Sequence, residues 1–144
     1  MRIIICGSMV FAQDMLDARD KLQTLGHQVV LPEFTEIYVT DKEWQIRVQD
    51  PGSMIGAQRK IDYDLIRKYY HEIVQGDAIL VINRDKRGIK NYIGGNSFLE
   101  MGFAYVLGKK TFVLNPLPKD LTLIYQELIA MQPIIINGNF KKIK

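Results

Sequence analysis

The sequence has little of several residue types, and each scarcity excludes a class of protein. A single cysteine, Cys6, excludes an internal disulfide and favours a reduced, cytosolic compartment. The two histidines, His27 and His71, have no neighbouring ligand pattern, so we expect neither a metal site nor a cofactor. No apolar run reaches membrane length, and the first residues have the pattern of a strand rather than of a signal peptide. We therefore expect a soluble cytoplasmic protein.

The sequence also lacks a large excess of either basic or acidic residues. There are 19 basic and 16 acidic residues, so the net charge is only +3. This balance suits a phosphorylated small molecule but is too weak to indicate a nucleic-acid partner. With 144 residues, of which 47% are hydrophobic, the chain has the size and composition of one globular domain over 1–144.

Short apolar runs alternate with segments of helical periodicity. The expected strands cover residues 2–6, 28–31, 78–82, 111–114 and 134–136. The expected helices cover residues 10–25, 57–75, 97–107 and 119–131. This alternation predicts an α/β fold of the flavodoxin-like or Rossmann-like type, a three-layer sandwich with a five-stranded parallel sheet in the order 2-1-3-4-5.

One segment departs from this alternation. Residues 33–56 show weak periodicity, and an irregular segment of this length is typical of a lid or a binding loop. Trp44 and Met54 in this segment either close over a ligand or pack the loop against the domain. We expect a long loop there that can act as a lid.

Ligands of open parallel sheets bind beyond the carboxyl ends of the strands. In this sequence those ends fall at Gly7 and Ser8, at 83–95, and at Asn115. We therefore predict a substrate site at this edge of the sheet. The residues expected to bind substrate are Gly7, Ser8, Met9, Asn83, Tyr92, Gly94, Gly95, Asn96, Ser97 and Asn115.

Glu100 is the only charged residue from Phe98 to Leu107. An ionised carboxylate near the start of an otherwise apolar helix requires an explanation. One explanation is structural, because Ser97-x-x-Glu100 has the spacing of a capping box and the helix dipole favours negative charge there. The other explanation is catalytic. The two are compatible, since a capping glutamate can also face a ligand crevice.

The segment Gly-Gly-Asn-Ser-Phe-Leu-Glu-Met-Gly-Phe-Ala-Tyr, from Gly94 to Tyr105, is followed by Gly-Lys-Lys-Thr. It resembles the nucleoside 2-deoxyribosyltransferase family and its relatives, the 2′-deoxynucleoside 5′-phosphate N-hydrolases. In that family a glutamate followed by x-Gly-x-Ala is the nucleophile that captures C1′ of the sugar, and the resemblance gives this role to Glu100. The turn Ile5-Cys6-Gly7-Ser8 resembles that of the phosphate-recognising branch.

The resemblance implies cleavage of the N-glycosidic bond of a nucleoside 5′-monophosphate or a (deoxy)nucleoside. A carboxylate can stabilise or trap the oxocarbenium-like sugar that forms when the base departs. Water then collects the sugar in a hydrolase, and a second base collects it in a transferase. Ser8 is expected either to bind a 5′-phosphate or 5′-hydroxyl, or simply to cap the first helix.

Relatives place a second carboxylate on the helix before the central strand, where it orients the sugar or protonates the base. Asp64 is one candidate for this group, and Tyr69 takes the matching position if the helix is longer. Asp64 can equally serve the electrostatics of the helix start. Transferases tend to have a tyrosine late in the first strand, whereas this chain has Ile4, which favours the hydrolase branch. The resemblance also implies a homodimer or a higher homo-oligomer.

Other functions fit parts of the pattern. The run from Gly94 to Glu100 is similar to the Gly-Gly-x-Gly-Thr-x-x-Glu motif of lysine-decarboxylase-like phosphoribohydrolases, although it lacks the second motif glycine and has Ser for Thr. The non-catalytic alternative is a nucleotide-sensing module that binds its ligand without turnover. The sequence leaves open the base and the choice between ribose and 2′-deoxyribose.

Overall fold

The apolar runs form the strands of one parallel sheet. The structure, a computed structural model, describes residues 1–50 and 52–144; position 51, inside the expected loop, lies outside the described residues. The strands are β1 (Arg2–Gly7), β2 (Gln28–Val30), β3 (Ala78–Ile82), β4 (Lys110–Val113) and β5 (Ile134–Ile135). Their order is β2-β1-β3-β4-β5, and every neighbouring pair is parallel. The predicted fold class is therefore confirmed.

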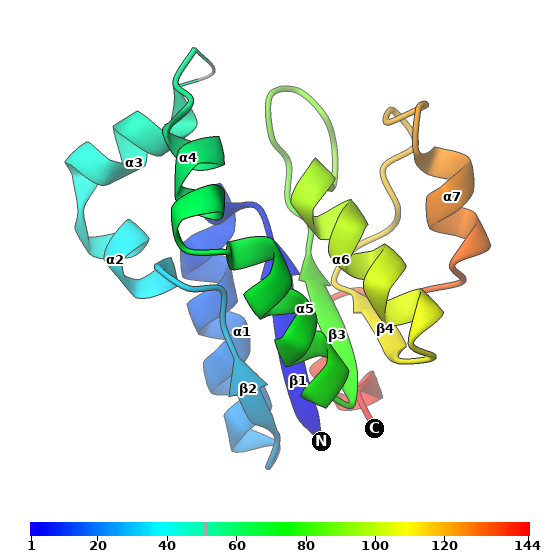
Figure 1. The fold of residues 1–144 in the computed structure, drawn as a ribbon. Coiled ribbons are helices and arrows are strands. Elements are labelled where there is room, and N and C mark those ends of the chain that lie inside the picture. Colours follow the sequence, from blue (N-terminus) through cyan, green and yellow to red (C-terminus); the bar gives the residue numbers. More distant parts are fainter. Residues whose placement is uncertain (51) are drawn as a thin grey trace.

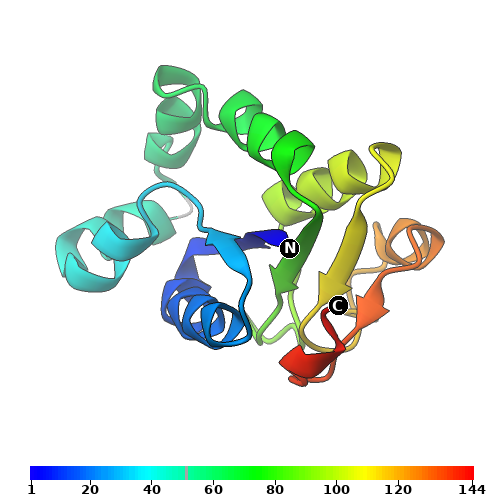
Figure 2. The ribbon, with the colours of Figure 1, turned by 90° about the horizontal axis from the view of Figure 1, so that it is seen from below.

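Helices cover both faces of this sheet (Figures 1 and 2). The α-helices are α1 (Ala12–Thr24), α2 (Thr35–Thr40), α3 (Lys42–Gln49), α4 (Ile55–Asp62), α5 (Leu65–Gln75), α6 (Gly95–Val106) and α7 (Tyr125–Ala130). Two short 3-10 helices are η1 (Met9–Phe11) and η2 (Phe140–Lys142). Helix α1 lies on one face, and α5 and α6 lie side by side on the other (Figure 2). No helix of the described residues is long and apolar enough to cross a membrane.

Strand β1 joins the two layers of the core. Successive side chains of a strand point to opposite faces of the sheet. Ile3 and Ile5 accordingly belong to the cluster that packs on α1, while Ile4 and Cys6 belong to the cluster that packs on α5 and α6. All four are fully buried. The alternation places the Cys6 thiol on the same side of the sheet as α6.

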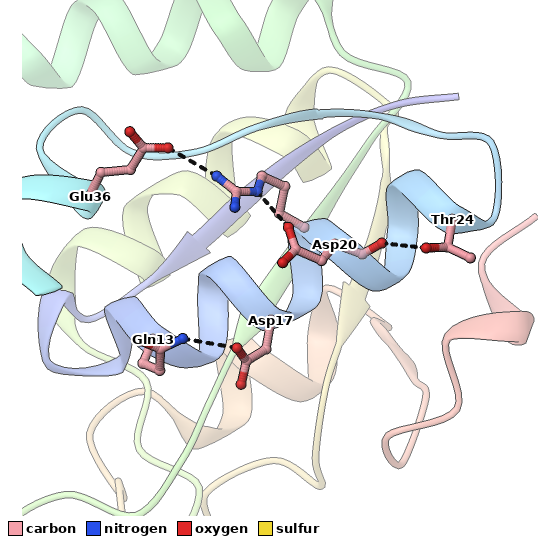
Figure 3. A network of polar contacts seen from close by, with 6 residues as sticks. Gln13, Asp17, Asp20, Thr24 and Glu36 are labelled. Atoms are coloured by element: carbon pink, nitrogen blue, oxygen red, sulfur yellow. Dashed lines mark hydrogen bonds and ion pairs between the residues drawn. The ribbon is translucent and has the colours of Figure 1, made fainter.

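The prediction of an irregular loop over 33–56 is wrong, since this segment contains α2, α3 and the start of α4. Helices α2 and α3 were not predicted because they are short and because α3 contains no buried residue. Asp41 caps α3 by accepting a hydrogen bond from the Trp44 amide at 3.0 Å. Figure 3 shows the link to the first helix, in which Arg19 of α1 contacts Glu36 of α2 at 3.0 Å.

Two helix boundaries also differ from the prediction. The helix expected over 57–75 is divided into α4 and α5, because Asp64 adopts a left-handed backbone conformation with φ of 50°. The apolar side chains of 57–75 continue across this break, so periodicity alone could not locate it. The helix expected over 119–131 begins only at Tyr125, since turns occupy most of the preceding residues.

Asn83 locks together the carboxyl ends of β3 and β4. Its buried side chain donates to the carbonyl oxygens of Asn91, Asn115 and Pro116 at 3.1 to 3.3 Å. Its Oδ1 accepts a hydrogen bond from the Asn115 amide at 2.9 Å, and the Asn115 side chain donates to the Asn83 carbonyl at 2.8 Å. The two asparagines thus satisfy backbone groups where the strands end.

We predict that Asn83→Ala lowers the free energy of unfolding by about 2–4 kcal/mol, because buried backbone groups lose their partners. Asn115→Ala removes one side-chain hydrogen bond and is expected to cost about 1 kcal/mol. Urea denaturation of both variants measures the difference. Equal losses for the two variants would contradict the assigned role of Asn83.

Candidate active site

A cavity of about 1280 Å³ lies at the carboxyl edge of the sheet. The turn after β1, the loop 84–95 after β3, and helices α4, α5 and α6 contribute to its walls. Figure 1 shows that α4, this loop and the first turn of α6 lie at the same end of the sheet. The residues predicted for the site that line the cavity are Gly7, Ser8, Met9, Tyr69, Tyr92, Gly94, Gly95, Asn96, Ser97 and Glu100.

Three predicted site residues do not line the cavity. Asn83 and Asn115 are absent from its walls because their side chains bond to one another's backbone and to neighbouring carbonyls. Asp64 is exposed at the start of α5, where its carboxylate lies 3.7 Å from Arg67. In the structure the two asparagines therefore hold the ends of β3 and β4 together, and Asp64 lies at the start of α5.

Helix α6 begins earlier than the sequence pattern indicated. Gly94 is the N-cap residue in an extended conformation, and Phe98 donates to its carbonyl at 2.9 Å. Ser97 is consequently the third residue of the helix, and its side chain is buried. The capping box of Ser97 and Glu100 is therefore wrong, because Ser97 does not occupy the cap. Glu100 lies in the second turn, where a capping role cannot explain it.

Glu100 lies at a point where α6 faces β1 and α5. Burial raises its pKa from 4.5 to about 8, and a hydrogen bond with Cys6 and the charge of Lys60 offset part of that rise. Burial and the adjacent Glu100 together raise the pKa of the Cys6 thiol well above its ordinary value. Both groups are therefore mainly protonated near neutral pH.

Tyr69 brings α5 into the same group. Its hydroxyl donates to the carbonyl of Ile5, the residue before Cys6 on β1. Burial, followed by the proximity of Cys6 and Glu100, raises the pKa of Tyr69 well above its ordinary value. Tyr69 thus remains a phenol that fixes α5 against β1 next to the carboxyl group of Glu100.

The other side of the cavity is basic. Lys86 donates to the Ser8 hydroxyl at 2.8 Å and lies 5.0 Å from the ring centre of Tyr92. The tight turn that carries Lys86 is closed by two hydrogen bonds between Lys86 and Ile89. Burial and the nearby Arg87 lower the pKa of Lys86. Among the described residues, no carboxylate forms an ion pair with Lys86. The half-buried ammonium group of Lys86 therefore lies beside Ser8 without a negatively charged partner among these residues.

Gly7 permits the close approach on which this arrangement depends. A Cβ atom at Gly7 would lie 2.7 Å from Cε of Met15 and 3.0 Å from the Ile82 carbonyl oxygen. These distances are shorter than van der Waals contact. A side chain at position 7 would therefore require Met15 and the end of β3 to shift, and glycine keeps the end of β1 close to β3 just before Ser8.

Several residues of the cavity wall were not singled out in the sequence. They are Arg59 and Lys60 of α4, Glu72 of α5, and Lys86. Lys86 could have been found, since it follows a central strand at its carboxyl end. No sequence signal places α4 over the cavity. Within 1–50 and 52–144, no group of three or more His, Cys, Asp or Glu side chains is arranged to hold a metal ion.

The sheet order defines a flavodoxin-like α/β protein, and the cavity at the carboxyl edge of its sheet is lined by the carboxyl group of Glu100. No protein-family model matches the chain, and no curated protein matches it. It is similar in structure to a 2-deoxyribosyltransferase from the psychrotolerant bacterium Bacillus psychrosaccharolyticus, with a TM-score of 0.55 and 18% sequence identity. The match covers 94% of this chain and 98% of that chain. At this identity the likeness shows a shared fold.

We predict that ionisation of Glu100 destabilises the folded protein. A pKa raised to about 8 means that its stabilising contribution is complete below pH 4.5 and is lost as the pH rises toward 8. Glu100→Gln removes this loss, so its free energy of unfolding relative to wild type should rise by about 4 kcal/mol between pH 4.5 and 8.5. Urea denaturation across this pH range measures the effect.

The matched control is Glu43→Gln on α3, whose side chain is 87% exposed. Its free energy of unfolding should follow that of wild type at every pH, because water solvates this carboxylate in both states. A Glu100→Gln curve that also runs parallel to wild type would show that Glu100 is not buried as described.

Proposed function

We propose that this protein cleaves the N-glycosidic bond of a nucleoside 5′-monophosphate or (deoxy)nucleoside, with Glu100 as the nucleophile. The observation that carries this proposal is the position of Glu100, a carboxyl group that lines a large cavity and is supported from behind by β1 and α5. The similarity in fold to a 2-deoxyribosyltransferase adds support. On this proposal residues 1–144 form a single domain of the 2-deoxyribosyltransferase type.

In the proposed reaction an oxygen of ionised Glu100 attacks C1′ of the sugar. The bond between C1′ and the base nitrogen breaks, and its electron pair leaves with the base, which takes up a proton. The sugar is then held as an ester of Glu100. Attack by water releases the free sugar or sugar phosphate, whereas attack by a second base nitrogen gives a new nucleoside; both restore the carboxyl group.

Ser8 and Lys86 suit a 5′-phosphate. The Lys86 ammonium is held 2.8 Å from the Ser8 hydroxyl, and no carboxylate in the described part of the chain neutralises it. A phosphate placed there would accept hydrogen bonds from both side chains and compensate the desolvated charge. This arrangement favours the phosphate-recognising branch, and thus a nucleotide N-hydrolase, over a transferase acting on free nucleosides.

We predict that the wild-type protein releases free base from one or more nucleoside 5′-monophosphates. Glu100→Gln should lower this rate by roughly a thousandfold or more, because the amide cannot capture C1′. The variant should still be stabilised thermally by its ligand. Asp64→Asn is the control with a second carboxylate removed outside the cavity, and its rate should stay close to wild type. Chromatography of free base measures all three proteins.

The pH dependence of the same reaction tests the role of Glu100. The value of kcat/KM reports groups of the free enzyme, and a nucleophile must be ionised. The rate should therefore rise with pH and level off above about 8. A rate that falls through this range would assign Glu100 to acid catalysis. Ligand binding without base release from any nucleoside or nucleotide would instead favour a sensor.

We also propose that the protein acts as a homodimer through an apolar surface on α5 and α6. Ile66, Leu99 and Val106 are exposed there, and Tyr70 and Phe103 join the two helices with ring centres 5.2 Å apart. Exposed apolar patches of this kind are typical of protein interfaces. Because Ile66 and Leu99 also line the cavity, a second copy on this surface would complete the cavity rim.

Sedimentation should accordingly show a dimer. Val106→Glu places a charge at a side chain that is 83% exposed and should produce a monomer without loss of secondary structure. Leu123→Glu is the control, since Leu123 is 93% exposed outside α5 and α6 and should leave the dimer intact. A monomeric wild-type protein would contradict the proposal.

A further inference from the structure

Residues after β2 and from α2, α3 and α4 also line the cavity. This part of its wall, here called the base compartment, comprises Leu31, Tyr38, Gln49 and Arg59. If a 5′-phosphate lies at Ser8 and Lys86 and C1′ lies at Glu100, the base must point away from the phosphate. A base directed toward the base compartment would meet Arg59 and Gln49. This assignment rests on the proposed function.

Arg59 is held in this compartment by two aromatic rings. Its guanidinium carbon lies 4.0 Å from the ring centre of Trp44 and 4.4 Å from that of Phe34. These distances are well within the range of a cation–π interaction. The ring centres of Phe34 and Trp44 are 5.9 Å apart and the rings are tilted by 40°, so the guanidinium is held between them. Two contacts to one planar group restrict its orientation.

The two rings are in turn fixed by their neighbours. Tyr38 packs on Trp44 with ring centres 5.7 Å apart, and Tyr63 packs edge-on against Phe34 at 5.4 Å. Phe34 has a φ of 72°, a left-handed conformation that is costly for a bulky residue. The surrounding aromatic contacts hold Phe34 in this conformation, and the conformation places its ring against Arg59.

The N–H groups of Arg59 have no acceptor within residues 1–50 and 52–144. Among the described residues, Arg59 forms neither a hydrogen bond nor an ion pair with a carboxylate, and only the more distant charges of Tyr63 and Glu33 act on it. A guanidinium is donor-only and offers two parallel N–H groups to a pair of adjacent acceptors. The guanidinium of Arg59 is planar, oriented and partly buried, and it lines the cavity. It is therefore suited to donate two hydrogen bonds to a pair of adjacent acceptors on a ligand.

We propose that the base compartment binds a 6-oxopurine, with Arg59 donating to O6 and N7 of the base. These two atoms are adjacent acceptors on guanine and hypoxanthine, and arginine pairs with them in bidentate fashion in nucleic-acid recognition. Adenine presents an amino donor in place of O6, which opposes the donors of arginine. Pyrimidines lack the N7 acceptor. Arg59 is therefore the specificity-determining residue of the substrate.

Gln49 is suited to assist this recognition. Its amide nitrogen donates to the Tyr38 hydroxyl at 2.6 Å, which leaves its oxygen as an acceptor on the cavity wall. A 6-oxopurine carries an N1–H donor beside O6, whereas adenine has a bare acceptor nitrogen at that position. An acceptor from Gln49 thus matches N1–H on the Watson–Crick edge, and the donors of Arg59 match O6 and N7 on the adjacent Hoogsteen edge.

The test is a calorimetric titration of the Glu100→Gln protein, which binds without turnover. The ligands are the 5′-monophosphates of guanosine, inosine, adenosine and cytidine, each in the ribo and 2′-deoxy forms. Guanine and hypoxanthine nucleotides should bind about tenfold or more tightly than the adenine nucleotide. Adding Arg59→Met should abolish this preference and change adenine binding by less than about twofold. Arg59→Lys should also lose most of the preference, because lysine lacks the planar fork.

The matched control is Arg67→Met on α5, which removes an arginine that does not line the cavity and should preserve the preference. Equal binding of guanine and adenine nucleotides, or a preference that survives Arg59→Met, would overturn the proposal. An equal loss for all nucleotides in Arg59→Met would also overturn it and would place the phosphate at Arg59. Since these are binding measurements, they are separate from the test of base release.

Discussion

Strand β1 is covered on both faces, and its central residues Ile3, Ile4, Ile5 and Cys6 have no exposed surface. With α1 on one face and α5 and α6 on the other, a ligand can approach the middle of the sheet only from the strand ends. Gly7 ends the strand at a crowded position, where a Cβ atom would lie 3.0 Å from the Ile82 carbonyl oxygen, and Ser8 follows in the cavity wall. The position of the cavity, of Ser8 and of the group around Glu100 all follow from this double coverage.

The same packing makes the ionised form of Glu100 unfavourable in free energy. A carboxyl group between β1 and α5 loses part of its hydration, and the Cys6 thiol and the charge of Lys60 compensate only part of that loss. Replacement by an apolar residue would remove this cost, and the rest of α6 is almost entirely apolar. Perturbed carboxyl groups beside a cavity are concentrated at functional sites, since folding alone gives no reason to retain them.

The sequence predicts the sheet well because its strands are short, fully apolar and separated by clear turns. Ala78–Ile82, for example, has no polar residue and is buried along its whole length. Glu100 could also be identified, because it interrupts an apolar helix. The break at Asp64 could not be predicted, since it depends on one backbone conformation inside a continuous apolar pattern. Helix α3 is short and contains no buried residue, so no core-facing apolar stripe marks it in the sequence.

The capping-box interpretation of Ser97 and Glu100 shows a further limit of spacing arguments. The spacing is present, yet the helix begins at Gly95, so both side chains are shifted inward from the cap. Gly94 takes the cap position, where a Cβ atom would lie 3.2 Å from the Tyr92 ring. The contact of Glu100 with Cys6 joins residues far apart in the sequence, and only the packing of α6 on β1 brings them together.

A buried carboxyl group with a pKa of about 8 has consequences for the proposed chemistry. In the free protein the ionised form is disfavoured because the site lacks a full countercharge. In the proposed reaction, positive charge would develop on the sugar next to Glu100 as the base departs, and it would supply that countercharge. The attraction is stronger in a partly desolvated site than in water, and it would exist only near the transition state. On this proposal, the desolvation that opposes ionisation of the free protein favours the charged pair that forms when the glycosidic bond breaks.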